Sequence, residues 1–261
     1  LWQKRLMVAG FEKTFEIGRQ FRNEGISREH LQDYSQMEFY WAYADYRQGM
    51  ELVRRMYQHV IKKTYGRLTF SIGNFNDIDL SGEWAEIDYV GTVQKRTGID
   101  VLKSNDAEMK EKLKELGAKF DDTDTGGRLI DALWKICRKE IKGPVFLVNL
   151  PVAVSPLAKR KEDNPLLTER YQVIIAGTEL GNGYSELNDP IDQTERFSEQ
   201  QRMREAGDEE AQMFDAEFVE ALEHGMPPTT GFGVSERLFS FLENRPIREC
   251  VLFPLVRPAT R

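Results

Sequence analysis

Hydrophobic residues recur along the chain with two different periods, and the period separates strands from helices. Over residues 8–21 the large apolar side chains lie at even-numbered separations, and this period of two predicts a strand. Residues 34–43 are aromatic and apolar again, after a polar stretch at 23–33. We therefore expect two antiparallel strands joined by a long polar loop, and such loops are often functional.

Helical spacing of apolar residues follows over residues 45–65. Lys62 and Lys63 lie in the last expected turn and Gly66 comes just after it, which is typical of a helix C-terminus. The same criteria predict further helices at residues 106–116, 128–141, 191–206 (on the surface), 215–224 and 236–242, strands at 145–148, 169–178 and 229–235, and an extended segment at 151–156.

The middle third of the chain is charged and helical. A polar loop separates the helices expected at 106–116 and 128–141, and we expect about residues 100–143 to form a helical insertion packed on the main sheet. The order of elements along the chain predicts an α+β fold with a mostly antiparallel sheet and helices segregated around it.

Composition narrows the function classes. The chain has 261 residues, with 36 Lys and Arg against 43 Asp and Glu, and a net charge of −7. This length supports one large globular domain or at most two small ones. The apolar runs are far shorter than the ~20 residues that span a bilayer, so we expect no membrane protein. The acidic balance argues against a broad nucleic-acid-binding face, so any RNA contact must be local or made by another domain.

The two cysteines, Cys137 and Cys250, lie far apart without CxxC spacing. Neither a disulfide framework nor a thiolate zinc site is favoured. We expect two buried structural thiols in a protein of the reducing cytoplasm.

Two short segments carry candidate chemistry. In residues 21–26, Arg22 offers a planar donor fork for phosphate or carboxylate, and Glu24 can accept from an exocyclic amine. A surface Arg/Glu pair on a hairpin is the alternative. In residues 231–237, two glycines lie on a strand where a planar ligand can approach the backbone, and Arg237 follows at a helix start. Tight strand-to-helix packing explains this segment equally well.

The segment 179–189 is the most informative. Alternation along a strand puts Leu180, Asn182, Tyr184 and Glu186 on one side, with Glu179 on the other side or beyond a bend. An amide, an aromatic ring and a carboxylate in one row suit a cationic substrate. A buried polar row is costly unless it binds something, although a polar edge strand facing water remains the alternative.

Together these segments resemble the class II aminoacyl-tRNA synthetases. Residues 21–25 resemble motif 2 of that family and 231–237 resemble motif 3. Residues 179–189 are similar to the amino-acid-pocket strand of class II lysyl-tRNA synthetases in particular, and residues 151–159 and 252–258 also match that family. The resemblance covers nearly the whole chain in family order, and it implies a class II synthetase-like catalytic domain over residues 1–261.

The resemblance implies that ATP activates L-lysine to lysyl-adenylate, which is then transferred to tRNA(Lys). Arg22 would hold the α-phosphate and the lysine carboxylate, and Arg237 would face the adenine and the γ-phosphate, so these two arginines are the implied catalytic residues. Glu24 would accept from the adenine amino group, Tyr34 would stack on the adenine, and His30 would lie near the outer phosphates. The step mainly requires positioning and charge neutralisation.

The resemblance also implies a lysine pocket. Glu186 would be the counter-charge of the substrate's ε-ammonium, which needs protein acceptors in exchange for its hydration shell. Tyr40 would hydrogen-bond near the ammonium, Glu38 would receive the α-amino group, and Asn182 and Tyr184 would line the pocket. Glu38 and Tyr40 are two residues apart on a strand and so should share a face.

Departures from the family pattern concern the phosphates and the metal. Glu179 would coordinate Mg²⁺, because hard cations favour carboxylate oxygens. The family usually has a second glutamate seven residues earlier, where this sequence has Gln172, a weaker neutral oxygen donor. Motif 3 is one residue shorter than usual, and Glu29 stands where an arginine commonly precedes the histidine.

Motif 1 and an N-terminal anticodon-binding domain would both lie before Leu1, so the chain is expected to be a C-terminal fragment with little activity of its own. The full-length protein would be a homodimer, and this chain would then expose an apolar dimer surface and an unpaired sheet edge.

Three functions fit these residues. The first is a lysine–tRNA ligase. The second is a paralogue that ligates lysine or a related amino acid to a protein, and the third is a catalytically idle paralogue that binds a nucleotide or a partner.

Overall fold

The structure is a computed structural model that describes residues 1–22, 27–207 and 211–255. Its strands are β1 (Lys13–Phe21), β2 (Asp33–Ala42), β3 (Thr69–Ile72), β4 (Phe75–Asp79), β5 (Ala85–Asp88), β6 (Val145–Val148), β7 (Arg170–Ile175), β8 (Thr178–Ser185) and β9 (Thr229–Ser235). Its α-helices are α1 (Trp2–Val8), α2 (Tyr46–Tyr65), α3 (Tyr89–Thr97), α4 (Asp106–Glu115), α5 (Gly127–Cys137), α6 (Pro190–Glu205), α7 (Ala216–Glu223) and α8 (Arg237–Leu242).

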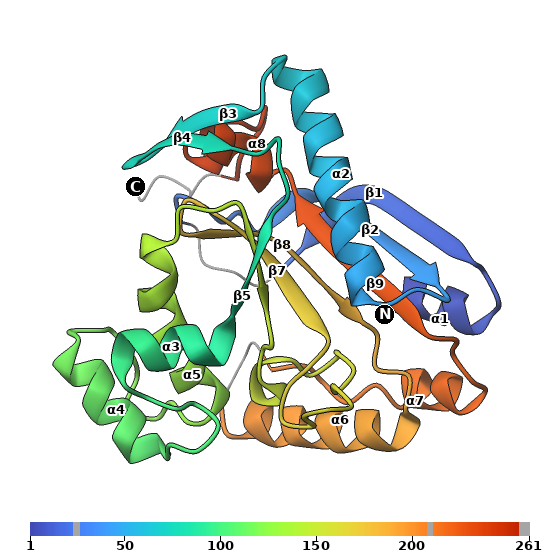
Figure 1. The fold of residues 1–261 in the computed structure, drawn as a ribbon. Helices are drawn as coiled ribbons and strands as arrows, with labels where there is room; N and C mark the ends of the chain where they lie inside the picture. The colour runs from blue at the N-terminus through green and yellow to red at the C-terminus, as the bar shows by residue number, and fades with distance from the viewer. Residues whose placement is uncertain (23–26, 208–210, 256–261) are drawn as a thin grey trace, which may run out of the picture.

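One large sheet organises the molecule. Within the described residues it has seven strands in the order β1-β2-β9-β8-β7-β6-β5, and β3 pairs with β4 in a separate ribbon. All neighbours in the large sheet are antiparallel except β5 and β6. Helices surround this sheet (Figure 1), so the predicted α+β architecture with a mostly antiparallel sheet is confirmed.

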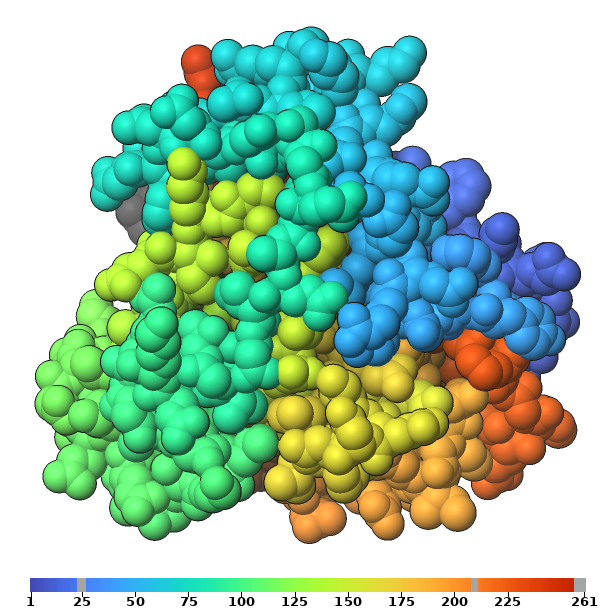
Figure 2. Space-filling view, viewed as in Figure 1, coloured from blue at the N-terminus to red at the C-terminus, as the bar shows by residue number. Residues whose placement is uncertain are grey.

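Helix α2 covers one face of the sheet and begins and ends as the sequence predicts. Asp45 caps its N-terminus in a capping box, and Gly66 ends it with a φ of 69°. The helix lies close to the sheet at Gly49, where an added Cβ would be 2.7 Å from the Thr230 hydroxyl oxygen. Figure 2 shows α2, in light blue, lying over the near surface of the molecule.

The core under α2 is aromatic. Tyr57 of α2, Tyr171 of β7 and Phe232 of β9 are fully or almost fully buried there, and the Tyr171 and Phe232 rings stack with centroids 6.0 Å apart. Burial of such large rings supplies much of the apolar area removed from water.

A second core lies between α3, α4, α5 and strands β6 and β7. Leu129 and Leu133 of α5, Leu147 of β6 and Ile174 of β7 are buried in it. Because Tyr171 and Ile174 are three apart on β7, they lie on opposite faces of the sheet, so this helical layer packs on the face opposite α2. Tyr89 of α3 shares the core, which therefore includes a helix that precedes the segment expected to be an insertion.

The start of the chain departs from the predicted strand at residues 8–21. Residues Trp2–Val8 form α1, and β1 begins only at Lys13. The helix buries Lys4 and Met7, which lie three residues apart and so share a helical face. Gly10, with a φ of 92°, lies between the helix and the strand.

Other local predictions need smaller corrections. Residues Val152–Val154 form a 3-10 turn instead of an extended segment. The expected strand at 169–178 is β7 followed by a turn at Ala176 and Gly177, both with positive φ, and β8 then starts at Thr178. Helix α6 is not purely a surface helix, since it buries Arg196 and Phe197.

The two thiols differ in exposure. Cys137 is buried as predicted, but Cys250 is exposed, and neither forms a disulfide. Across the described part of the chain, no helix has both the length and the apolar character needed to cross a membrane.

Candidate active site

A cleft of about 280 Å³ opens on the face of the sheet opposite α2, and residues of β2, β8, β9 and α8 line it. Its floor is β9, which lies between β2 and β8. Gly231 pairs with Tyr40 on one side and Tyr184 on the other, while Gly233 pairs with Glu38 and Asn182. Because neither glycine carries a side chain, four polar residues surround an open floor.

Gly231 cannot be replaced without filling this space. A Cβ at Gly231 would lie 2.4 Å from Oε1 of Glu186 and 2.7 Å from a ring carbon of Tyr40. Gly231 therefore marks a close approach at the floor of a pocket, which is one of the two interpretations that the sequence left open.

A β-bulge in β8 determines which side chains enter the cleft. Gln172 pairs with Asn182 but Ile174 pairs with Glu179, so two residue steps on β7 match three on β8. The extra residue brings Glu179 to the same face as Asn182, Tyr184 and Glu186. Simple alternation was therefore wrong for Leu180, whose side chain is buried in the core under α2.

The end of the cleft near α1 is closed by a buried ion pair. Glu186 is 2% exposed, and its Oε2 lies 2.6 Å from Nζ of Lys4, which is itself almost fully buried. The Lys4 ammonium also donates to the Tyr184 hydroxyl at 3.3 Å and lies 5.0 Å from the centroid of that ring. Burial raises the pKa of Glu186 to about 7, against the opposing attraction of Lys4.

Strand β2 contributes the neighbouring polar row. Glu38 and Tyr40 share a face as predicted, with the Tyr40 hydroxyl donating to Oε2 of Glu38 at 3.4 Å. The Gln36 amide donates to the other oxygen of Glu38. Glu38 is therefore held by two neutral donors of its own strand and lines the cleft beside Glu186.

A hydrogen bond from Arg170 of the neighbouring strand β7 fixes the orientation of the Asn182 side chain. The buried guanidinium of Arg170 donates to its Oδ1 at 2.8 Å and is itself fixed by Ser155 at 3.1 Å and by the backbone oxygen of Val154. Because Arg170 occupies the amide oxygen of Asn182, the amide nitrogen is the group left to face a ligand. Asn182 is thus suited to donate to an anion such as an amino-acid carboxylate.

The other end of the cleft is cationic. Arg22 and Arg237 both line it, so the two arginines expected to clamp a nucleotide lie on one cavity. The Arg22 guanidinium lies 6.0 Å from the Tyr34 ring centroid. Arg237 donates to the backbone oxygen of Glu179, and its Nη1 lies 3.1 Å from Nε2 of His30. Glu24 and the last residues of 252–258 lie outside the described residues.

Glu179 also lines this cationic end, beside Arg237. Trp134 of α5 donates to its Oε1 at 2.8 Å, and Gln172 of β7 donates to its Oε2 at 2.9 Å. In the described part of the chain, no cluster of three or more His, Cys, Asp or Glu side chains suits a metal ion. This donor set fits Mg²⁺ only as an ion held mainly by phosphate oxygens, with Glu179 as the protein carboxylate.

The structure thus brings together all of the predicted site residues that it describes. Sequence reasoning missed four side chains that hold them: Lys4, Gln36, Trp134 and Arg170. Trp134 and Arg170 lie in no recognisable motif, since their roles depend on packing between distant segments. Lys4 had one available indication, because a helical pattern over residues 2–8 puts it on the same face as Met7.

Comparison with known proteins identifies the family of the chain. The family model described as tRNA synthetases class II (D, K and N) matches residues 1–257. The chain belongs to this family. The predicted class II synthetase fold is thereby confirmed.

The similar relatives are named lysine–tRNA ligases. The chain is 45% identical to that of Thermotoga maritima over 260 residues, which is 99% of this chain and 51% of the relative. It is 44% identical to that of Thermotoga sp. strain RQ2 over 99% of this chain and 51% of the relative. The ligase of Roseiflexus castenholzii is 42% identical over 99% of this chain and 53% of the relative. This class II synthetase chain therefore spans about half the length of the curated relatives that it matches.

Proposed function

We propose that the protein is a lysine–tRNA ligase, which joins L-lysine to ATP as lysyl-adenylate and transfers the lysyl group to tRNA(Lys) in the cytoplasm. One observation carries the proposal: a fully buried carboxylate, Glu186, closes one end of a cleft whose other end holds Arg22 and Arg237. A substrate that is cationic at one end and joined to phosphate at the other matches this charge distribution. The lysine-ligase names of the relatives support the choice of amino acid.

Different residues along the cleft would bind different groups of the lysine substrate. Glu186, with the Tyr40 and Tyr184 hydroxyls nearby, would receive the ε-ammonium, and Glu38 would receive the α-ammonium. Asn182 would donate to the lysine carboxylate, whose oxygen attacks the α-phosphorus while the bond to pyrophosphate breaks. Because both reacting groups are anionic, the chief requirement is neutralisation of charge at the point of attack.

Two guanidinium groups would supply that neutralisation. Arg22 would bridge the carboxylate and the α-phosphate, and Arg237 would hold the outer phosphates together with His30. Tyr34 would stack on the adenine, and Glu24 would accept from its amino group. No side chain needs to act as a nucleophile or general base in this step.

Glu179 would hold Mg²⁺, and Gln172 would support it. The ion would supply positive charge that neutralises the phosphate oxygens. Trp134 and Gln172 keep the Glu179 carboxylate facing the cleft before any ligand arrives. Such preorganisation reduces the reorganisation needed during reaction.

The decisive experiment is lysine-dependent exchange of pyrophosphate into ATP, measured on the full-length protein. We expect exchange with lysine and none with arginine or asparagine, and Arg22→Ala should abolish it. Charging of transcribed tRNA(Lys) then separates the ligase from a paralogue that lysylates a protein, since the paralogue would exchange pyrophosphate but leave tRNA uncharged. Nucleotide binding without exchange would instead indicate a catalytically idle protein.

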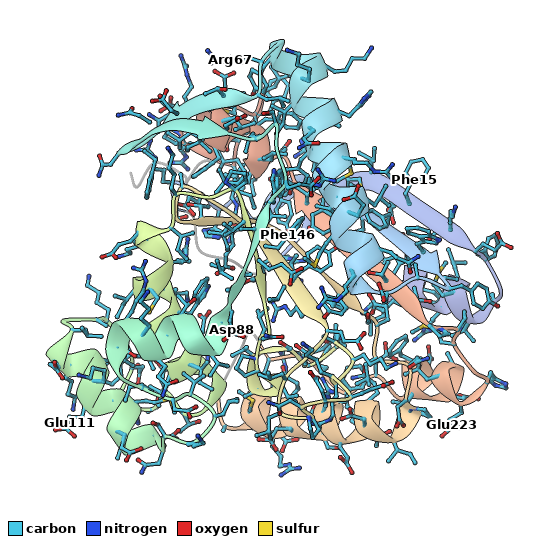
Figure 3. The ribbon with its side chains drawn as sticks, viewed as in Figure 1. Phe15, Arg67, Asp88, Glu111, Phe146 and Glu223 are labelled. Atoms are coloured by element: carbon cyan, nitrogen blue, oxygen red, sulfur yellow. The ribbon has the colours of Figure 1, made fainter. Side chains whose placement is uncertain are left out.

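We also infer a homodimer that uses the edge of the sheet at β1. Phe15, Ile17 and Phe21 lie on alternate positions of this edge strand and are more than 70% exposed. Figure 3 shows Phe15 on this outer part of the sheet, beyond the area that α2 covers. A row of exposed aromatic and aliphatic side chains favours a protein partner. Light scattering of the full-length protein should give twice the monomer mass, and Phe15→Glu should reduce it.

A further inference from the structure

Lys4 lies outside the cleft wall and contacts two residues, Glu186 and Tyr184, at the proposed amino-acid end of the cleft. It is 3% exposed, while Glu186 and Tyr184, which it contacts, both line the cavity. The residues that form the cavity wall do not include Lys4. It reaches this position because α1 packs through Met7 on a third core, which also contains Tyr40 and Phe197.

The two carboxylate oxygens of Glu186 face different neighbours. Oε2 lies 2.6 Å from the Lys4 ammonium. Oε1 lies above the floor glycine, since a Cβ on Gly231 would come within 2.4 Å of it. Lys4 therefore occupies one oxygen and leaves the other toward the open floor, where a ligand would meet it.

Lys4 also orients the Tyr184 hydroxyl through a second hydrogen bond. Because the Lys4 ammonium donates to the Tyr184 hydroxyl, this oxygen acts as an acceptor toward Lys4, and its own proton must point elsewhere. One ammonium thus fixes two of the side chains assigned above to the lysine pocket.

The other groups around Glu186 do less than Lys4 to offset the cost of burying its negative charge. The titratable and charged groups around Glu186 are Lys4 and the Leu1 amino group, Glu38 and Tyr40 of β2, and Tyr184 of β8, with Tyr171 of β7 on the opposite face of the sheet. Strand β9 adds no charged group here, because the residue of β9 next to Glu186 is Gly231. Lys4 is the side chain in direct ionic contact with Glu186, and Glu38 adds repulsion.

Stability alone is a weak reason for such a pair. Replacing a buried ion pair by packed apolar residues is often neutral or stabilising, because taking two charges out of water is costly. Burial by itself drives a carboxyl group toward its neutral form. A neutral Glu186 would lose its attraction for a substrate ammonium.

We propose that Lys4 is a positioning residue for lysine recognition, which favours the ionised form of Glu186 and directs Oε1 of Glu186 and the Tyr184 hydroxyl toward the substrate's ε-ammonium. The inference rests on the proposed function. Lys4 does not touch the substrate, and its charge partly offsets that of Glu186. Lys4 therefore makes the Glu186 carboxylate more ionised near neutral pH than burial alone would allow, at the cost of some attraction for the substrate.

The test is the pH dependence of the lysine KM in pyrophosphate exchange, for the wild type and for Lys4→Met in the full-length protein. Without Lys4, Glu186 should titrate at higher pH, and below its pKa the ionised fraction falls tenfold per pH unit. We expect the variant's lysine KM at pH 6.5 to exceed that of the wild type at least about tenfold. The ratio of the two KM values should shrink at least about tenfold by pH 9, with the ATP KM unchanged.

Two further variants keep the test decisive. Lys4→Gln removes the charge but keeps a hydrogen-bond donor, so it serves if Lys4→Met does not fold, and it should show the same pH-dependent ratio. Arg5→Met alters the next residue of α1, whose partners Asp215 and Glu217 lie outside the cleft, and should follow the wild-type profile.

Three results would overturn the proposal. A KM ratio that does not change with pH would mean that Lys4 is only structural. A lower lysine KM in Lys4→Met at pH 6.5 would mean that Lys4 competes with the substrate for Glu186. Wild-type protein that neither exchanges pyrophosphate nor binds lysine by calorimetry would overturn the proposed function together with this inference, whereas the first two results overturn this inference alone.

Discussion

Gly231→Ala is the substitution for which the structure gives the sharpest expectation. The added carbon would lie 2.4 Å from Oε1 of Glu186 and 2.7 Å from the Tyr40 ring, well inside normal contact. Relieving the clash requires a shift of about 1 Å in the carboxylate, which is held on its other side by Lys4. The methyl group would also occupy the space where an ammonium is expected to bind.

The size of the effect follows from that displacement. A misplacement of about 1 Å at a reacting or binding group costs on the order of a hundredfold in rate. This corresponds to about 2.7 kcal/mol. Overpacking a buried site lowers the free energy of unfolding by about 1–3 kcal/mol, so the protein should remain folded. We therefore expect Gly231→Ala to lower kcat/KM for lysine about a hundredfold while the ATP KM stays near the wild-type value.

Gly233→Ala provides the matched control. It lies two residues along the same strand and on the same face, but its added carbon would come no closer than 3.4 Å to Gln36 and Glu38. Pyrophosphate exchange at varied lysine and ATP, with a thermal denaturation of each variant, measures the comparison. A Gly231→Ala protein with the wild-type lysine KM, or equal losses in both variants, would refute the assignment of the pocket floor.

Three other substitutions test separate parts of the cleft. Glu186→Gln should raise the lysine KM about a hundredfold or more, because one partner of a buried charge pair is removed, and should change the ATP KM less than about threefold; equal loss of both would contradict its pocket role. Gln172→Glu places a second carboxylate beside Glu179 and should lower the Mg²⁺ concentration for half-maximal exchange about tenfold, which a Mg²⁺ titration measures; an unchanged midpoint would show that position 172 does not face the metal. Trp134→Phe removes the hydrogen bond to Glu179 at a net cost of about 1 kcal/mol, so exchange should slow about fivefold with kcat affected more than the lysine KM; a wild-type rate would show that this bond does not position the carboxylate.

The sequence predicted most elements because their patterns are local. The apolar spacing of α2, the lysines of its last turn and the Gly66 that follows them are all local signals, and the helix forms as expected. Alternation along β2 likewise placed Glu38 and Tyr40 on one face. Such periodicities depend only on neighbours in the chain.

The sequence predictions were wrong where contacts between distant segments determine the local structure. The strand predicted from residue 8 begins only at Lys13, and the preceding residues Trp2–Val8 form a helix that buries Lys4 against Glu186. The bulge in β8 appears only when β7 is paired with it, so alternation misplaced Leu180. The contact of Trp134 with Glu179 joins residues 45 apart, and no pattern within either segment indicates it.

In the proposed ligase, the bulged strand would also set the length of the amino acid that the cleft accepts. Glu179, at the proposed phosphate end, and Glu186, at the proposed ammonium end, belong to one continuous stretch of backbone, whose hydrogen bonds to β7 and β9 keep their separation constant. The length of the substrate side chain would therefore be selected by residues on a rigid strand, and not by a flexible loop. An amino acid shorter by one methylene, such as ornithine, would reach one end at the expense of the other, and a difference of one methylene is typically worth about 1–3 kcal/mol in discrimination.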